Sequence, residues 1–140
     1  MIRWILPWAV LLAGCASGGG GAPAAETVRE KVDRWLASAL KAHEVRTHAT
    51  GEHAAVQTEM GRIEAELRAV ARPRVLASVD EALSDIRDCL RDLESRRSAI
   101  LVAGRTLTAD EEQEAEQLGY ETETFLLAEG FLQDLRRDFE

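Results

Sequence analysis

The stretch TVREKVDRWLASALKAH, from Thr27 to His43, decides the fold. Its first four residues, Thr27-Val28-Arg29-Glu30, carry the hydroxyl and the carboxylate of a capping box, which satisfies the unpaired amides at the start of a helix. Core-type positions then recur every three or four residues, the spacing of one buried helical face. They are Val28, Val32, Trp35, Ala39 and His43, with Leu36 and Leu40 on the shoulder. The pattern predicts an amphipathic helix that begins at Thr27.

Similar stripes continue along the chain. The second stripe is His53, Val56, Met60, Ile63, Leu67 and Val70, after which Pro73 interrupts the pattern. The third is Leu76, Val79, Leu83, Ile86, Leu90 and Leu93, in a helix expected to run to about Val102 with Gly104 as its C-terminal cap. A second capping box, Thr108-Ala109-Asp110-Glu111, opens a last helix with Leu118, Phe125, Leu132, Leu135 and Phe139. These stripes predict an all-α fold over residues 26–140, an antiparallel four-helix bundle.

The segment RTHATGEH, from Arg46 to His53, leaves a second architecture open, because the apolar phase of the first stripe continues through it. One overlong first helix would then give a three-helix bundle. Thr47, Thr50 and Gly51 are poor helix-interior residues, and an unbroken helix of about 70 Å would overhang its neighbours. We therefore favour a turn near Gly51, with the three-helix bundle as the alternative.

Composition and charge exclude several classes of function. The chain has 140 residues, enough for one core, and a formal net charge of -8, whereas nucleic-acid binding relies on clustered Lys and Arg. The sequence contains no G-x-S-x-G elbow, no phosphate-binding glycine loop and no H-E-x-x-H. We expect no nucleic-acid partner and no enzymatic activity.

The N-terminal residues resemble a targeting segment. Met1-Ile2-Arg3 precedes the apolar run WILPWAVLLA, which is shorter than the roughly 20 residues of a membrane-spanning helix and is typical of a signal peptide. The run ends in Leu12-Ala13-Gly14-Cys15, which resembles the lipobox of bacterial lipoproteins. We expect residues 1–14 to be a signal peptide that is removed.

The lipoprotein resemblance implies that Cys15 receives a diacylglyceryl group and that the new amino terminus is acylated after cleavage behind Gly14. Residues 15–25 are then a lipidated cysteine and a flexible Gly/Ala tether. Asp after the cysteine commonly retains such proteins on the inner membrane, and this chain has Ala16. We expect attachment to the outer membrane through lipid on Cys15, with the protein facing the periplasm.

Three histidines raise the question of a metal site. His43, His48 and His53 are five residues apart, so on one continuous helix they point in different directions. If the chain reverses near Gly51, His43 and His53 lie on core-facing stripes at the same end of a hairpin. We expect no bound metal or cofactor, the two histidines being partly buried and hydrogen-bonded to backbone or water. A metal or cofactor carrier that uses His43 and His53 is the alternative.

Two further features concern partners. Cys89 lies on the shoulder of the third stripe, which predicts a buried, inert thiol, with a disulfide-linked homodimer as the alternative. On the last helix Leu126, Leu127 and Phe131 widen the apolar arc, which indicates either deep burial or a docking surface for a partner or a second copy. The acidic run from Asp110 to Glu123 is a solvated face or faces a basic partner. We expect a structural or adaptor module of the bacterial cell envelope.

Overall fold

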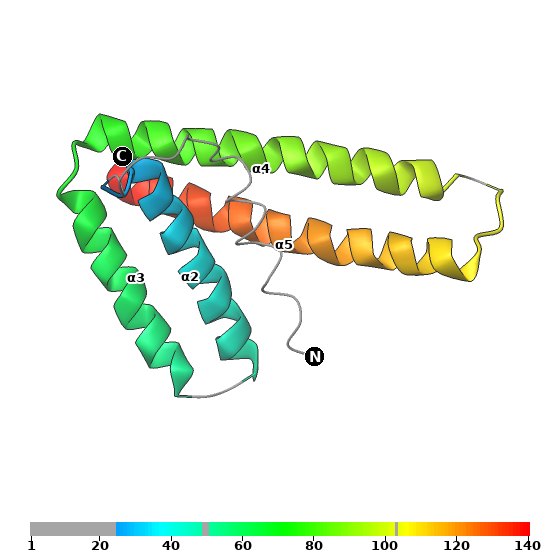
Figure 1. The fold of residues 1–140 in the computed structure, drawn as a ribbon, viewed down its shortest axis with the longest axis horizontal. Helices are drawn as coiled ribbons and strands as arrows, with labels where there is room; N and C mark the ends of the chain where they lie inside the picture. Colours follow the sequence, from blue (N-terminus) through cyan, green and yellow to red (C-terminus); the bar gives the residue numbers. More distant parts are fainter. Residues whose placement is uncertain (1–24, 49–50, 103) are drawn as a thin grey trace. The chain divides into compact units, whose positions relative to one another are not determined.

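The computed structural model describes residues 25–48, 51–102 and 104–140 and places four helices in them (Figure 1). These are α2 (Val28–His48), α3 (Glu52–Arg68), α4 (Arg72–Ile100) and α5 (Ala109–Phe139). The described residues contain no β-strand, and the predicted all-α, four-helix architecture is confirmed. The predicted signal peptide, Cys15 and the predicted tether as far as Ala24 lie outside the described residues. Among the helices that are described, none has the length and apolar character to span a membrane.

The chain divides after Ala69 into two compact units, which are described separately. The first described hairpin consists of α2 and α3, which lie side by side (Figure 1). Its start is the predicted capping box: the Glu30 amide donates to Thr27 Oγ1 at 3.1 Å, and the Thr27 amide donates to Glu30 Oε2 at 3.0 Å. Both ends of the reciprocal contact are made, so the predicted helix start is confirmed.

The alternative architecture, a three-helix bundle with one overlong first helix, is wrong. Arg34 on α2 donates from Nη2 to Glu66 Oε2 on α3 at 2.7 Å, whereas one continuous helix would hold these residues roughly 48 Å apart. The chain therefore reverses between His48 and Glu52. Residues 49 and 50 themselves lie outside the described part.

The first hairpin buries most of the two stripes predicted for it. The buried residues are Val32, Trp35, Leu36, Ala39 and Ala42 on α2 and Val56, Ile63 and Leu67 on α3. His43 was predicted to continue the stripe but is exposed, and Ala42 is buried in its place. After Ala39 the next buried residue is three positions further on, at Ala42, and not four positions further on, at His43. The polar imidazole of His43 therefore stays in solvent.

The second hairpin consists of α4 and α5. Pro73 stands in the first turn of α4, where its missing N–H removes no intrahelical hydrogen bond. Thr108 caps α5 as predicted, because its Oγ1 accepts from the Glu111 amide at 3.2 Å. Asp110, Glu111 and Glu112 fill the first turn and stabilise the positive end of the helix dipole.

Helices α4 and α5 pack along a seam with heptad-like spacing. The buried positions of α5 alternate by three and four residues from Phe125 through Ala128, Leu132 and Leu135 to Phe139, the spacing of a coiled-coil seam. Two ion pairs connect the helices: Arg136 Nε to Asp80 Oδ1 at 2.7 Å and Arg87 Nε to Glu129 Oε2 at 3.2 Å. Seven residues forward on α4 correspond to seven residues backward on α5, so the pair is antiparallel.

The predicted end of α4 is wrong. The helix ends at Ile100, and Leu101 leaves helical geometry at φ -86° and ψ 52° while its amide still donates to the Arg97 carbonyl. Gly104, predicted as the C-terminal cap, lies beyond this point with φ +78°. This left-handed conformation, which favours glycine, turns the connecting segment toward α5 and does not cap α4.

Candidate functional site

The residues proposed from the sequence fall in different places. Cys15, the predicted lipidation site, lies outside the described residues. The described part of the chain offers three features with chemical character: the histidines of α2 and α3, a network of charges around Arg34, and one exposed face of α5.

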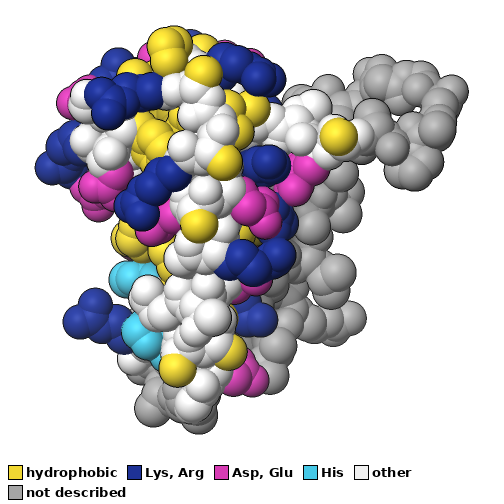
Figure 2. Space-filling view, turned by 90° about the vertical axis from the view of Figure 1, so that its left-hand side faces the viewer, with side chains coloured by type: hydrophobic (Ala, Val, Ile, Leu, Met, Phe, Trp, Pro, Cys, Tyr) yellow, Lys and Arg dark blue, Asp and Glu magenta, His cyan; other side chains and the backbone are white. Residues whose placement is uncertain are grey.

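The histidines do not meet as a buried pair. His43 is exposed on α2 and His53 is half-buried on α3, and Figure 2 shows histidine side chains at the molecular surface. His53 Nε2 lies 3.5 Å from Gln57 Nε2. Within residues 25–48, 51–102 and 104–140, no group of three or more His, Cys, Asp and Glu side chains is arranged to hold a metal ion. Metal binding through His43 and His53 stays an untested alternative.

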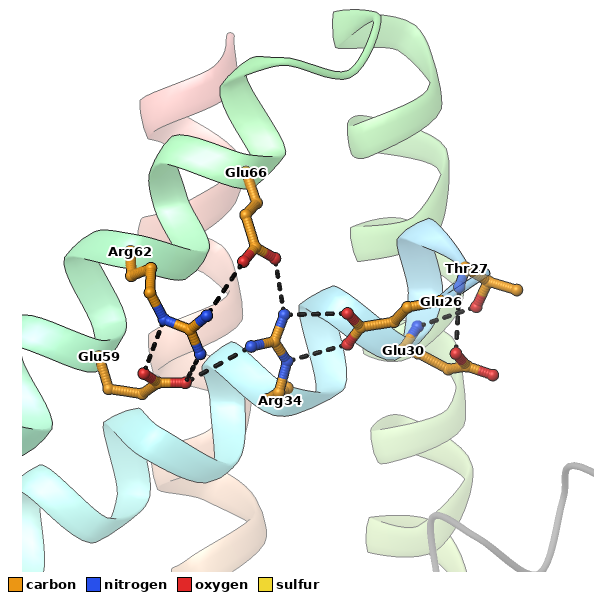
Figure 3. A network of polar contacts seen from close by, with 7 residues as sticks. All are labelled: Glu26, Thr27, Glu30, Arg34, Glu59, Arg62 and Glu66. Carbon is orange, nitrogen blue, oxygen red and sulfur yellow. Dashed lines mark hydrogen bonds and ion pairs between the residues drawn. The ribbon is translucent and has the colours of Figure 1, made fainter. Parts of the chain in front are cut away.

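The Arg34 network connects α2, α3 and Glu26, which lies two residues before α2 (Figure 3). The guanidinium of Arg34 donates to both carboxylate oxygens of Glu26 at 2.9 and 3.0 Å, and to Glu66 at 2.7 Å and Glu59 at 3.4 Å. Arg62 lies beside it and contacts Glu59 at 2.6 Å and Glu66 at 3.5 Å. The planar, many-donor guanidinium suits this role, because one side chain serves three carboxylates from different segments.

Electrostatics within the network favour the charged forms. Partial burial lowers the pKa of Arg34, but the hydrogen bonds and charges of Glu26 and Glu66 outweigh it, so the pKa is raised. The hydrogen bond from Arg62 is the main cause that holds the pKa of Glu59 below its ordinary value. Both shifts favour the charged forms of Arg34 and Glu59. The arrangement is that of a structural clamp.

Trp35 provides a second polar link in the first hairpin. Its side chain is buried, with 5% of its surface exposed, and its indole N–H donates to Glu64 Oε1 at 3.0 Å. A buried indole with a satisfied N–H is a packing residue. Trp35 thus supports the hairpin.

Cys89 is half-buried on α4, and not fully buried as its spacing predicted. It lies three residues after the buried Ile86 and four before the buried Leu93. Cys89 therefore lies at the edge of the buried stripe, between the core and solvent, which is the shoulder position that its spacing predicted. Whether its thiol is inert or links two copies stays a prediction.

One face of α5 is apolar and exposed. We define the α5 outer face as six residues that line one open groove: Glu123, Leu126, Leu127, Gly130, Phe131 and Asp134. Their spacing puts them on one side of the helix, turned away from the buried positions. Leu126 is 53% exposed and Leu127 is 38% exposed. The predicted deep burial of these two leucines is therefore wrong, and the docking-surface interpretation stays open.

The charge on α5 has one sign over most of its length. No Lys or Arg occurs between Thr106 and Leu135, whereas nine acidic residues do: Asp110, Glu111, Glu112, Glu114, Glu116, Glu121, Glu123, Glu129 and Asp134. Arg105 pairs with Glu111, Arg87 of α4 pairs with Glu129, and Arg137 pairs with Asp134. The other six carboxylates all precede Phe125 and keep the N-terminal side of the α5 outer face negative.

Sequence reasoning missed the Arg34 network. The partners of Arg34 are eight, 25 and 32 residues away, distances that carry no local pattern. Only the spacing of Glu59, Arg62 and Glu66, three and four residues apart on α3, was visible as ordinary helix-surface pairing. The network depends on the hairpin and could be found only after the two helices were aligned.

The comparisons with known proteins supply no family. No protein-family model, no curated protein and no solved structure matches the chain. The functional argument therefore depends on the residues themselves.

Proposed function

We propose that this protein is a lipid-anchored lipoprotein of the bacterial cell envelope that faces the periplasm and acts as a structural or adaptor module. The observation that carries the proposal is Leu12-Ala13-Gly14-Cys15 at the end of an apolar run too short to span a bilayer. Acyl chains on Cys15 would hold the protein at the membrane, since several chains on one residue make attachment effectively permanent.

The order of segments supports the proposal. Residues 15–25, which begin at Cys15, are dominated by Gly and Ala, a composition that predicts a tether with a typical span of about 17–20 Å. The first described helix begins directly after this tether, at Val28. This order suits a protein that is attached to a membrane: a short apolar leader is followed by a cysteine that can be modified, then by a tether, and then by the helical part.

The adaptor role is supported by the kind of surface the helices carry. Their polar contacts are ion pairs and hydrogen bonds of structural type, and the α5 outer face exposes leucine side chains. Exposed apolar residues on a helix commonly mark contact with another macromolecule. Binding, and not chemistry, is the activity that these features support best.

Metabolic labelling tests the anchor. Cells expressing the full chain are fed an alkyne-bearing palmitate, and the purified protein is examined for label and by mass spectrometry. We expect label on the protein, loss of the label in Cys15→Ala, and a mass that corresponds to cleavage after Gly14. Cys89→Ala is the matched control, because it removes the other cysteine and should keep the label. An intact Met1 or an unmodified Cys15 thiol in the wild type would refute the proposal.

Membrane fractionation tests the location. We expect the wild-type chain in the outer-membrane fraction and the Ala16→Asp variant in the inner-membrane fraction, because Asp after the cysteine commonly retains lipoproteins there. Ala16→Ser is the matched control and should behave as the wild type. Wild-type protein in the inner-membrane fraction would contradict the assigned location without affecting the anchor.

A further inference from the structure

The α5 outer face combines three properties that the fold of the second hairpin does not use. It exposes Leu126 and Leu127, it is bordered by Glu123 and Asp134, and it contains a glycine in mid-helix. The glycine lowers the stability of an isolated helix, and the two leucines leave apolar surface in water. Their occurrence on one face suggests a common purpose.

The glycine is the first part of the argument. Gly130 lies inside α5, where glycine is less favourable than alanine by about 1 kcal/mol. A Cβ built at Gly130 would meet no other atom within 4 Å, so no neighbour inside the chain requires the missing side chain. Gly119, eleven residues earlier on the same side of the helix, has the same property. Small residues on an outer face allow another backbone or a large side chain to approach closely.

The charge is the second part. Glu123 and Asp134 are exposed and border the apolar centre, roughly 16 Å apart along the helix axis, and Asp134 pairs with Arg137 of the same helix. No Lys or Arg occurs between Thr106 and Leu135. An apolar centre that is acidic on its Glu123 side is complementary to a helix that places basic residues beside its own apolar centre.

A second copy of the chain is a poorer match. If two outer faces met in parallel orientation, Glu123 of one copy would face Glu123 of the other, which is unfavourable at the border of a dry contact. In antiparallel orientation Glu123 would face the Asp134–Arg137 pair of the other copy, which carries no net charge and offers no net attraction. The same consideration disfavours a bilayer with anionic headgroups.

We propose that the α5 outer face is the docking site for a basic amphipathic helix of a partner protein. The partner's apolar residues, spaced by three and four, would contact Leu126 and Leu127 and approach Gly130 closely, and its Lys or Arg residues would pair with Glu123. This inference deepens the adaptor part of the proposed function by naming the chemistry of the partner. It is independent of the lipid anchor.

A peptide titration tests the proposal. The purified full-length protein in phosphatidylcholine nanodiscs is titrated with a fluorescent Leu/Lys peptide that has Leu at i, i+3, i+4 and i+7, with empty nanodiscs as the blank. The matched peptide has Glu in place of every Lys. We expect the Lys peptide to bind at least about tenfold more tightly than the Glu peptide, with an affinity that falls as salt is added. Equal binding of the two peptides would overturn the proposal.

Variants locate the binding. The Leu126→Ala and Leu127→Ala double variant should weaken binding of the Lys peptide by about tenfold or more, whereas Leu101→Ala, at a leucine 46% exposed near the end of α4, should not. Glu123→Lys should weaken it further than Glu94→Lys, which makes the same charge change at an exposed position of α4. Helical circular dichroism confirms that each variant is folded.

Two results would overturn the assignment of the partner. Unchanged affinity in the double leucine variant would show that the peptide binds elsewhere. A wild-type dimer in sedimentation experiments that the double variant abolishes would show that a second copy occupies the face. Neither result depends on palmitate labelling of Cys15, so failure of this inference is distinguishable from failure of the anchor.

Discussion

The two hairpins of this protein are held together in different ways. In the first, α2 and α3 are connected by a network in which Arg34 contacts three carboxylates, and by the buried Trp35 with its hydrogen bond to Glu64. In the second, α4 and α5 are longer helices joined along a seam of alternating three- and four-residue steps. Both hairpins bury apolar stripes. The first adds a polar network centred on one arginine, whereas the second adds two separate ion pairs to a longer and more regular apolar seam.

The difference decides which kind of substitution each hairpin tolerates. A seam spreads its stabilisation over many similar residues, so loss of one side chain leaves a cavity but keeps the register. A network concentrates it on one guanidinium, so loss of that group removes a donor shared by three carboxylates, of which only Glu59 and Glu66 still contact Arg62. The predictions that follow use this contrast.

The largest effect is expected in the seam. Leu132 is fully buried on α5, and Leu132→Ala should lower the free energy of unfolding by about 2–5 kcal/mol, because it removes apolar contacts and leaves a cavity. Denaturant unfolding followed by circular dichroism measures it. Leu126→Ala makes the same chemical change six residues earlier on the exposed face and should change stability by less than about 0.5 kcal/mol. Equal effects would contradict the assignment of inner and outer faces.

A smaller loss is expected in the network. Arg34→Ala should destabilise the protein by about 1–2 kcal/mol, because Glu26, Glu59 and Glu66 lose their shared donor and repel one another. Arg34→Lys is the matched control: it keeps the charge but cannot form the two parallel bonds to Glu26, so it should recover only part of the loss. Full recovery would show that the charge alone matters and that the forked geometry does not.

A substitution of Gly130 should raise the stability of the protein, unlike the two substitutions above. Gly130→Ala should raise the free energy of unfolding by about 0.5–1 kcal/mol, since the new methyl group meets open space in the middle of a helix. Gly61→Ala, at an equally open position of α3, should stabilise the protein similarly. Only Gly130→Ala should also weaken binding of the basic peptide. If Gly61→Ala weakened peptide binding as much as Gly130→Ala does, Gly130 would no longer support the docking proposal.

The contrast also explains what the sequence could predict. The seam of α5 was visible beforehand, because Leu118, Phe125, Leu132, Leu135 and Phe139 follow helical periodicity and burial depends on spacing within one helix. Both capping hydroxyls were visible for the same reason, since a cap involves residues three apart. Patterns within one helix predict structure within that helix, and in this chain the apolar stripes also predicted the number of helices.

The errors arose where the outcome depends on a second helix or on the end of an element. His43 was placed on the buried stripe by spacing alone, but the stripe ends at Ala42. The end of α4 was placed two residues late because Gly104 is a good cap by type, although it serves the loop. Arg34 looked like any surface arginine, since its partners on α3 become neighbours only after the chain has reversed.

The smallest expected effect is a pH dependence that belongs to the first hairpin alone. The hydrogen bond from Arg62, aided by the charges of Arg62 and Arg34, lowers the pKa of Glu59 below its ordinary value of 4.5. As the pH falls, the unfolded chain therefore takes up this proton before the folded protein does. The stabilisation from Glu59 is fully present above pH 4.5 and is lost as the pH falls through the lower, folded value. Glu59→Gln should flatten the dependence of the unfolding free energy on pH in this acidic range.

A double-mutant cycle separates this effect from the general acid lability of a carboxylate-rich chain. Arg62→Gln removes the main cause of the shift and should flatten the same acidic range, and the Glu59→Gln, Arg62→Gln double variant should add little to either single change, because both remove one interaction. Urea unfolding at a series of pH values from neutral to below 4.5 measures each slope. Additive slopes would show that Glu59 and Arg62 act independently, and the network would then be a set of separate surface pairs and not one clamp.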